Sequence, residues 1–156
     1  YYKMFKKIII PILLLFLSSC GYEARHSKKN IVNYDFFING LTTNGDRDIN
    51  IKIREKLINY SLNKQGKELI LKISSDAKKV ATAKDTAGDP TSFKYTITIN
   101  IKVMMENEVE TYLQIVESFN YNNNSNRFDL KRYEREIINN LAETAAQKLI
   151  YKLSNI

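Results

Sequence analysis

The chain contains one cysteine, and the residues around it determine what its thiol can do. Cys20 follows Leu17, Ser18 and Ser19 and precedes Gly21. Small side chains before the cysteine suit a signal peptidase, which must bind an extended backbone there. A thiol is also the nucleophile suited to forming a thioether with a diacylglycerol. The pattern resembles the bacterial lipobox and predicts that Cys20 becomes a lipidated N-terminus.

The segment before this cysteine has the features of a secretory signal. Residues 8–17 form an apolar run that follows Lys3, Lys6 and Lys7. The run is too short to cross the hydrocarbon core, because a membrane-spanning helix needs about 20 residues. We therefore expect residues 1–19 to be a signal peptide. Residues 20–33 are then a lipidated N-terminus and tether, and the acyl chains anchor the protein to a membrane.

The charge balance is mildly basic once the signal is removed. The chain has 24 Lys and Arg against 17 Asp and Glu, and residues 1–19 contain three of the lysines. The remaining 21 basic residues (24 − 3) give a net charge of +4 (21 − 17). An exported lipoprotein meets no nucleic acid, so lipid head groups and glycolipid phosphates are the expected anionic neighbours. Gly21 stands where an Asp would favour inner-membrane retention, which predicts a lipid-anchored location on the periplasmic side of the outer membrane.

No constellation of residues indicates catalysis. The sequence has no glycine-rich phosphate loop, no GxSxG, no histidine pair for zinc and no DxDxDG calcium loop. The single histidine, His26, lies in the tether without a visible partner. Glu106, Glu108 and Glu110 share one side of a predicted hairpin, where a solvated turn explains them better than a weak cation site. We expect no enzyme activity, no cofactor and no bound metal.

The first part of the domain alternates between strand and helix patterns. A short aromatic and β-branched run predicts a strand at 34–38, closed by an Asn-Gly turn. Asp46 or Asp48 can cap an amphipathic helix that is expected to run down to Gly66. From Glu68 the spacing of the apolar residues changes from a helical repeat to an alternating one.

The second part predicts three strands and a long helix. Strands are expected at 68–84, 93–103 and 109–120, the last with a bulge near its end. A polar loop without core-forming residues is expected at 121–126. Residues 128–153 carry an apolar stripe at helical spacing. The order β-α-β-β-β-α predicts an α+β fold, in which two helices cover one face of a four-stranded, mainly antiparallel sheet.

Several short motifs recur in the order found in one known family. They are Cys20-Gly21-Tyr22, Ala83-Lys84-Asp85-Thr86-Ala87, the run YTITI at 95–99, Glu117-Ser118-Phe119, and AAQKLIYKL at 145–153. Their order and spacing resemble the LptE family of lipopolysaccharide-assembly lipoproteins. The resemblance implies that residues 34–156 form a single LptE-like domain without enzyme activity. It also implies a protein that plugs the LptD β-barrel, assists its assembly and helps deliver lipopolysaccharide to the outer leaflet.

The resemblance further implies a lipopolysaccharide site made of basic residues. In the family, such residues lie on the loop side of the sheet and near the start of the last helix. Lys131 matches the helix position, whereas the turn before the third strand lacks an arginine. The candidate basic cluster consists of Lys84, Lys94, Lys131 and Arg132. The first two flank that turn and the last two open the helix, and an antiparallel meander places both connections at the same end of the sheet.

A different class of function is also open. A stand-alone outer-membrane lipoprotein facing the periplasm can bind peptidoglycan or another protein through the open edge of its sheet. One experiment distinguishes the barrel plug from the stand-alone lipoprotein. The protein is isolated from outer membranes, and the question is whether a large β-barrel accompanies it.

Overall fold

The computed structural model describes residues 35–62, 64–105 and 109–156. The predicted signal peptide and the whole of the predicted tether, Cys20 included, therefore lie outside the described residues. Along the described chain the elements are β1 (Phe36–Gly45), α2 (Arg47–Leu57), the 3-10 helix η2 (Ile58–Tyr60), β2 (Lys67–Lys84), β3 (Pro90–Met105), β4 (Glu110–Asn122) and α3 (Arg127–Leu153).

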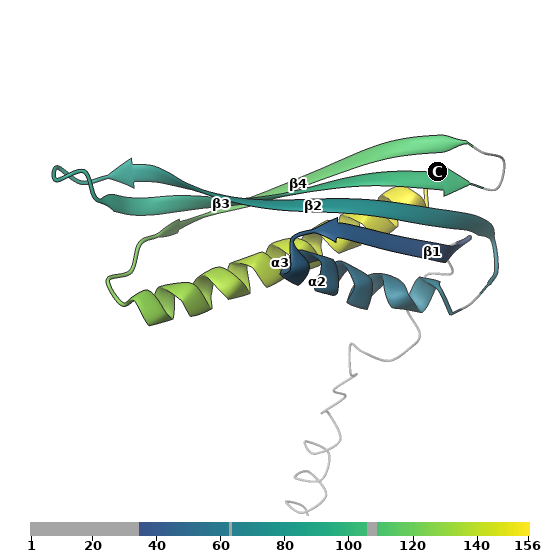
Figure 1. Cartoon of the computed structure of the whole chain (residues 1–156), viewed down its shortest axis with the longest axis horizontal. Coiled ribbons are helices and arrows are strands. Elements are labelled where there is room, and N and C mark those ends of the chain that lie inside the picture. Colours follow the sequence, from purple (N-terminus) through teal and green to yellow (C-terminus); the bar gives the residue numbers. More distant parts are fainter. Residues whose placement is uncertain (1–34, 63, 106–108) are drawn as a thin grey trace, which may run out of the picture. The chain divides into compact units, whose positions relative to one another are not determined.

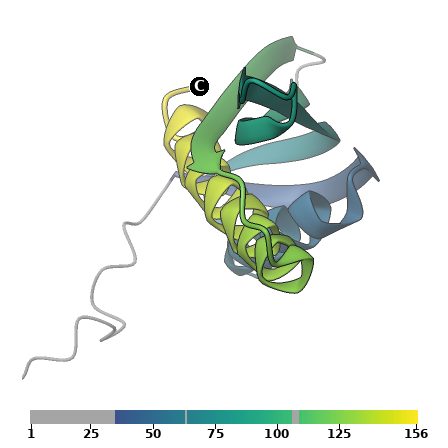
Figure 2. The ribbon, with the colours of Figure 1, turned by 90° about the vertical axis from the view of Figure 1, so that its left-hand side faces the viewer.

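The strands form one sheet in the order β1-β2-β3-β4. β1 is parallel to β2, whereas β2 with β3 and β3 with β4 are antiparallel. Because parallel neighbours need a crossover, α2 returns the chain from the end of β1 to the start of β2. α2 and α3 pack on each other and lie on the same face of the sheet (Figure 1 and Figure 2). The predicted α+β fold is confirmed.

The core lies between the sheet and the helices. Alternate residues of β3 face it, and Ile97, Ile99, Ile101 and Val103 are at most 1% exposed. α3 contributes a buried stripe along its second half: Ile137, Leu141, Ala142, Ala145, Ala146, Leu149, Ile150 and Leu153. The alanines let the helix lie close to its neighbours, since they add little side-chain volume. β3 and the second half of α3 therefore bury the faces that their periods predict, whereas Tyr133, on the same stripe nearer the start of α3, is 43% exposed.

β1 is longer than its sequence pattern predicts, and the prediction of a strand that ends at residue 38 is wrong. The register shifts between Ile38 and Gly40, and pairing continues to Gly45 opposite Ser75. This second half is polar, so pairing with β2 rather than an apolar pattern specifies it. Gly45 has φ +96°, and a Cβ there would lie 1.9 Å from the Ser75 carbonyl oxygen. Only glycine suits both the conformation and the close approach.

α2 begins as predicted and ends sooner. The Asp46 carboxylate caps it by accepting hydrogen bonds from the backbone N–H groups of Asp48 (3.0 Å) and Ile49 (3.1 Å). The α-helix stops at Leu57 and continues only as the single turn η2, so the helix predicted down to Gly66 is too long.

β4 differs from its prediction in two ways. Its pairing with β3 has no register shift, so the bulge predicted near its end is wrong. Tyr121, expected in a loop without core-forming residues, belongs to β4 and is 5% exposed. Glu117 interrupts the apolar pattern, and its carboxylate accepts a hydrogen bond from the Lys148 ammonium of α3 at 2.5 Å. The buried side of β4 thus contains a paired charge.

Candidate functional site

The β2–β3 hairpin, the end of β4 and the start of α3 lie at one end of the domain (Figure 1). The loop after β4 is held against the start of β3. There, the Asn123 backbone N–H donates to the Thr91 carbonyl at 2.9 Å, and its side-chain amide donates to the Pro90 carbonyl at 2.8 Å. The sequence argument that both connections share an end is therefore correct.

The hairpin is a projecting arm with a well-defined turn. The Asp85 carboxylate accepts hydrogen bonds from the backbone N–H groups of Ala87 and Asp89, both at 2.9 Å. Gly88 completes the turn with φ +92°. Residues 78–84 of β2 are all exposed, and the hairpin reaches beyond the start of α3 (Figure 1). Its polar groups are consequently open to a partner.

The start of α3 is rich in charge. Asn126 caps the helix by accepting from the backbone N–H groups of Phe128 and Asp129. Arg132 pairs with Asp129 at 3.1 Å. Within the described residues, Lys131 makes no ion pair, so its ammonium can bind an external anion.

The structure brings the four residues of the basic cluster to this end, on different sides of the sheet. All four are exposed. Lys94 alternates with Phe93 and Tyr95, which pack against the core, so Lys94 lies on the face away from the helices. Lys131 and Arg132 lie on α3, and Lys84 pairs with Pro90 beside the turn. We call Lys94 on one face, and Lys131 with Arg132 on the other, the two basic patches; Lys84 lies beside the turn, and the four residues do not form one pocket.

Lys79 is a further cation at this end, and its position depends on contacts that the sequence does not reveal. Its ammonium lies 3.9 Å from the centroid of the Phe93 ring and binds the Glu134 carboxylate of α3. Glu134 also accepts the Tyr121 hydroxyl at 2.7 Å. Burial is the main cause that raises the pKa of Tyr121, and the hydrogen bond to the Glu134 carboxylate is the second. The Tyr121 hydroxyl therefore stays protonated and remains a donor. This network fixes α3 against the sheet.

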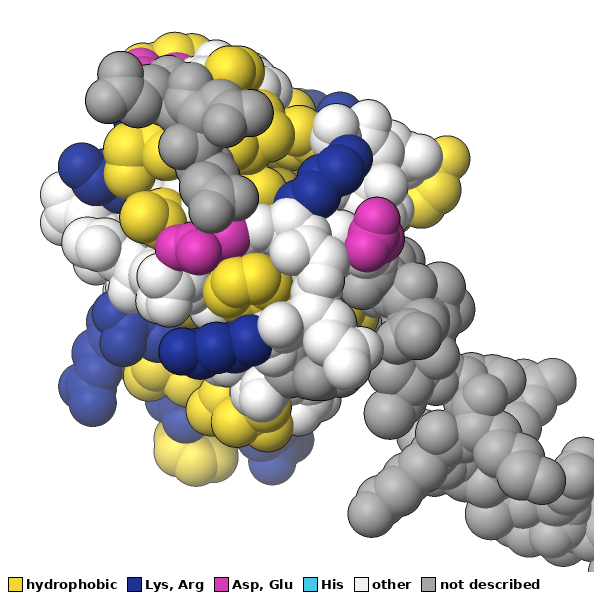
Figure 3. Space-filling model, turned by 90° about the vertical axis from the view of Figure 1, so that its right-hand side faces the viewer, with side chains coloured by type: hydrophobic (Ala, Val, Ile, Leu, Met, Phe, Trp, Pro, Cys, Tyr) yellow, Lys and Arg dark blue, Asp and Glu magenta, His cyan; other side chains and the backbone are white. Residues whose placement is uncertain are grey.

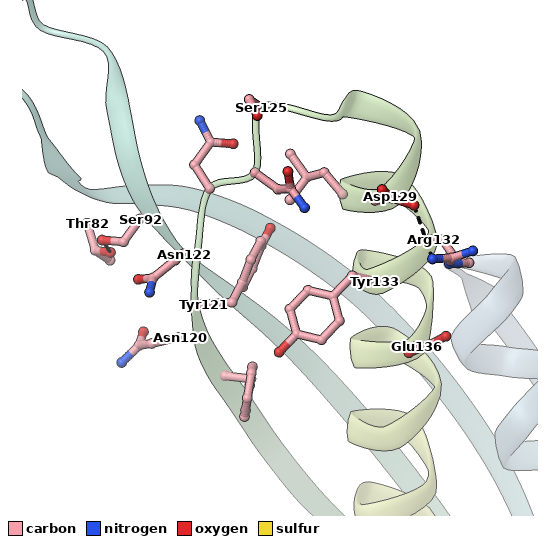
Figure 4. A pocket seen from close by; sticks show the side chains of 14 residues that line it. Thr82, Ser92, Asn120, Tyr121, Asn122, Ser125, Asp129, Arg132, Tyr133 and Glu136 are labelled. Atoms are coloured by element: carbon pink, nitrogen blue, oxygen red, sulfur yellow. Dashed lines mark hydrogen bonds and ion pairs between the residues drawn. The ribbon is translucent and has the colours of Figure 1, made fainter.

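A hollow of about 1130 Å³ lies beside that network. We call it the β4–α3 groove, and Figure 4 shows that it is bounded by the end of β4, the following loop and the first turns of α3. Its lining combines aromatic rings with amides and hydroxyls. The Tyr133 ring meets the Tyr121 ring edge-on, with centroids 6.0 Å apart and an interplanar angle of 81°. Sequence reasoning missed the groove, although the alternation of Phe119 and Tyr121 was a usable signal.

Across the part of the chain that the structure describes, no group of three or more His, Cys, Asp or Glu residues could hold a metal ion. Of the three glutamates considered as a weak cation site, Glu106 and Glu108 lie outside the described residues. Glu110 binds the Lys102 ammonium at 2.6 Å and accepts the Tyr112 hydroxyl at 3.0 Å. The hydrogen bond from Lys102 is the first cause of the lowered pKa of Glu110.

None of the helices in the described ranges is long and apolar enough to span a bilayer.

A four-stranded sheet under two helices, with basic patches and an open groove at one end, defines a small two-layer α+β domain. Solved structures share this fold. The rare lipoprotein B of Shewanella oneidensis matches with a TM-score of 0.61 at 10% identity, over 75% of this chain and 95% of that one. An uncharacterized lipoprotein B of Nitrosomonas europaea has a TM-score of 0.56 at 12% identity, over 86% and 90%. A minor lipoprotein of Acinetobacter baumannii has a TM-score of 0.54 at 8% identity, over 78% and 92%.

The family assignment rests on a match to the sequence model of a protein family, and not on these distant structures. No curated protein sequence matches the chain. The model of the LptE family, described as lipopolysaccharide-assembly, matches residues 31–153. The chain belongs to the LptE family, and the predicted family is confirmed.

Proposed function

We propose that this protein is an outer-membrane lipoprotein that plugs the LptD β-barrel, assists its assembly and helps deliver lipopolysaccharide to the outer leaflet. The observation that carries the proposal is the family match, which spans nearly all of the described domain. Cys20 supplies the lipid anchor on the periplasmic side, and the protein acts by binding, without a cofactor or enzyme activity.

The sheet face away from the helices has the chemistry that a barrel lumen requires. Thr96, Thr98 and Asn100 line this face of β3, and the Gln114 amide of β4 donates to the Asn100 side chain at 2.8 Å. Lumens of outer-membrane barrels are polar, so a plug binds through hydrogen bonds rather than through a large apolar patch. The uncovered sheet face is the proposed contact with the barrel.

Isolation from outer membranes in mild detergent tests the proposed partner. We expect a β-barrel protein to co-purify in a stable complex, because a plug buries a large surface against its barrel. Recovery of the lipoprotein alone, or only with peptidoglycan, would contradict the proposal and favour the stand-alone binding module.

Charge reversal tests lipopolysaccharide binding at the basic patches. Lipid A phosphates form charge-assisted bonds with lysines. The double variant Lys94→Glu, Lys131→Glu is expected to bind lipopolysaccharide roughly tenfold more weakly at low salt. The difference should shrink at high salt, because added ions screen exposed charges. Titration of labelled lipopolysaccharide at two salt concentrations measures both effects.

The matched control reverses two lysines at the opposite end of the domain. Lys67 begins β2 and Lys152 lies in the last turn of α3, and both are exposed. Basic, acidic and hydrophobic side chains are interspersed on that end (Figure 3). Lys67→Glu, Lys152→Glu changes the net charge equally and should leave binding nearly unchanged. Equal losses in both double variants would show a general charge effect and rule out the basic patches as the site.

A further inference from the structure

The turn that follows α2 exposes two large apolar side chains. Ile58 opens η2 and is 57% exposed, and Leu62, just after η2, is 76% exposed. The backbone N–H and the hydroxyl of Ser61 both donate to the Ile58 carbonyl, at 3.1 Å and 2.7 Å, which closes this segment into a tight turn. We call the described residues 58–62 and 64–67 the η2 tip. Single exposed apolar residues need no explanation, so the surroundings of this pair decide what it does.

The η2 tip lies where the chain enters the domain. The Lys67 backbone N–H donates to the Asp35 carbonyl at 2.9 Å. The Tyr60 ring stacks on the Phe36 ring at the start of β1, with centroids 5.4 Å apart and an interplanar angle of 9°. Asp35 is the first described residue, and only 15 residue steps (35 − 20) separate it from Cys20. The tip therefore adjoins the point at which the segment from the proposed lipid anchor joins the domain.

The length of that segment keeps the tip close to the membrane. Its 15 steps span at most about 50 Å when fully extended. β2 starts at the tip, has 18 residues and is about 60 Å long. An upright domain with its β2–β3 hairpin on the membrane would need a longer connection, whereas contact through the tip needs very little of it. Once the chain is acylated, contact of the tip with the lipid is an intramolecular event, so even a weak affinity gives a large docked fraction.

The charges around the tip suit a phospholipid surface. Lys64 is exposed and makes no ion pair within the described residues. A lysine beside inserted apolar side chains can place its ammonium among lipid phosphates. Asp35 adds one negative charge at the entry point. Glu68 alternates with the buried Leu69, so its carboxylate lies on the other face of the sheet, where the Asn39 amide donates to it at 2.6 Å. Apolar insertion therefore supplies most of the contact, and Lys64 adds a dependence on anionic lipid.

A lipid surface fits this end of the domain better than a second protein does. Hydrophobic side chains are interspersed there with basic ones (Figure 3). A stable protein interface needs a continuous, well-packed surface of about 800 Å² on each partner. Two protruding apolar side chains with a lysine beside them need only a surface that deforms around each of them, as lipid head groups do.

We propose that the η2 tip docks on the phospholipid leaflet that holds the anchor. Ile58 and Leu62 insert below the head groups, and Lys64 binds their phosphates. The proposal rests on the lipid anchor at Cys20 in the proposed function and concerns the lipoprotein before it joins its barrel. Docking through this end leaves the basic patches and the uncovered sheet face accessible to lipopolysaccharide and to the barrel.

Tryptophan fluorescence tests the contact directly, because the chain has no tryptophan. Leu62→Trp keeps a large apolar side chain at the tip. Phe128→Trp is the matched control at the other end of the domain, where Phe128 is 74% exposed. Each acylated lipoprotein is reconstituted into vesicles of phosphatidylcholine and phosphatidylglycerol with brominated acyl chains. We expect a blue shift and a loss of emission by quenching for Leu62→Trp, and neither for Phe128→Trp, because tryptophan settles at the membrane interface only where the docked surface brings it there.

Amide hydrogen exchange tests the same contact with the native leucine. Vesicle-bound wild type is compared with Leu62→Asp and Lys64→Gln, all held by the same anchor. Leu62→Asp should lower the docking equilibrium about tenfold and speed up exchange across the tip, since a hydrated charge replaces a buried leucine. Lys64→Gln should lower it about fivefold on vesicles with phosphatidylglycerol and very little on phosphatidylcholine alone. Both side chains are exposed, so circular dichroism should show both variants folded.

Three results would overturn the proposal. The first is no quenching of Leu62→Trp, and the second is equal quenching of both tryptophan reporters, which would show contact without a preferred surface. The third is protection of the tip that rises with the protein-to-lipid ratio and occurs without quenching, because it would assign the tip to a second copy of the chain.

These outcomes are separable from those of the proposed function. The vesicles contain neither a β-barrel nor lipopolysaccharide, so a failure to co-purify with a barrel leaves the docking result unchanged. A chain that is not acylated at Cys20 would incorporate no labelled fatty acid and would not remain with the vesicles. A missing anchor is thus distinguished from an anchored tip that does not dock.

Discussion

Ile99→Asp is expected to remove a large part of the stability of the domain at room temperature. Ile99 is 1% exposed at the middle of β3, between Ser75 of β2 and Ile115 of β4, with its side chain in the core. A carboxylate there loses its hydration without gaining a partner, so it must either remain charged in an apolar site or bind a proton. We expect a loss of about 3–5 kcal/mol, which is a large part of the stability of a small domain.

Chemical denaturation followed by circular dichroism measures this effect, and two variants control it. Ile99→Val should cost only about 1 kcal/mol, since it removes one methylene group. Thr96→Asp places the same carboxylate on the uncovered face, opposite Lys78, and should cost less still. Thr98 is a poorer control because it lies opposite Asp76, where a second carboxylate would be repelled. Similar midpoints for Ile99→Asp and Thr96→Asp would show that the two faces of β3 have been misassigned.

Cys20→Ser is expected to abolish lipid attachment completely. The chain has no second thiol that could form the thioether. Mass spectrometry of the membrane-extracted wild type should find Cys20 as the first residue, carrying acyl chains. Such chains add about 0.8 kcal/mol of membrane affinity per buried methylene, so the anchor is effectively permanent. In the variant, labelled fatty acid should not be incorporated.

A second variant tests whether the position of the thiol matters as well as its presence. Moving it by combining Cys20→Ser with Ser27→Cys should not restore labelling, because the residues before position 27 lack the small, aliphatic pattern. Labelling of this double variant, or a wild-type chain that retains residues 1–19, would contradict the prediction of a lipidated N-terminus at Cys20.

Periodicity predicted the parts of the fold in which one face is buried along a whole element. β3 alternates from Phe93 to Val103, and the second half of α3 repeats every three or four residues. Such patterns specify the element and its buried face together. The prediction failed where the apolar pattern is interrupted, as in the polar half of β1 and at Tyr121, a buried residue that stands among polar, exposed neighbours at the end of β4.

The candidate site was predicted only as far as topology allows. The order of the strands placed Lys84, Lys94, Lys131 and Arg132 at one end. It did not reveal that the sheet separates Lys94 from the α3 pair, since that depends on the face to which each side chain points. The β4–α3 groove was not predicted at all, because a hollow is defined by the space between elements rather than by any one of them.

The sequence by itself determined the type of each main element, the buried faces of β3 and α3, the predicted lipidation of Cys20 and the family. These depend on the order and local spacing of residues along the chain. Only the tertiary structure decided the parallel pairing of β1 through Gly45, the Lys79–Glu134–Tyr121 network and the groove beside it. The physical reason is that these features join residues far apart in the chain, and their contacts exist only after the helices have packed on the sheet.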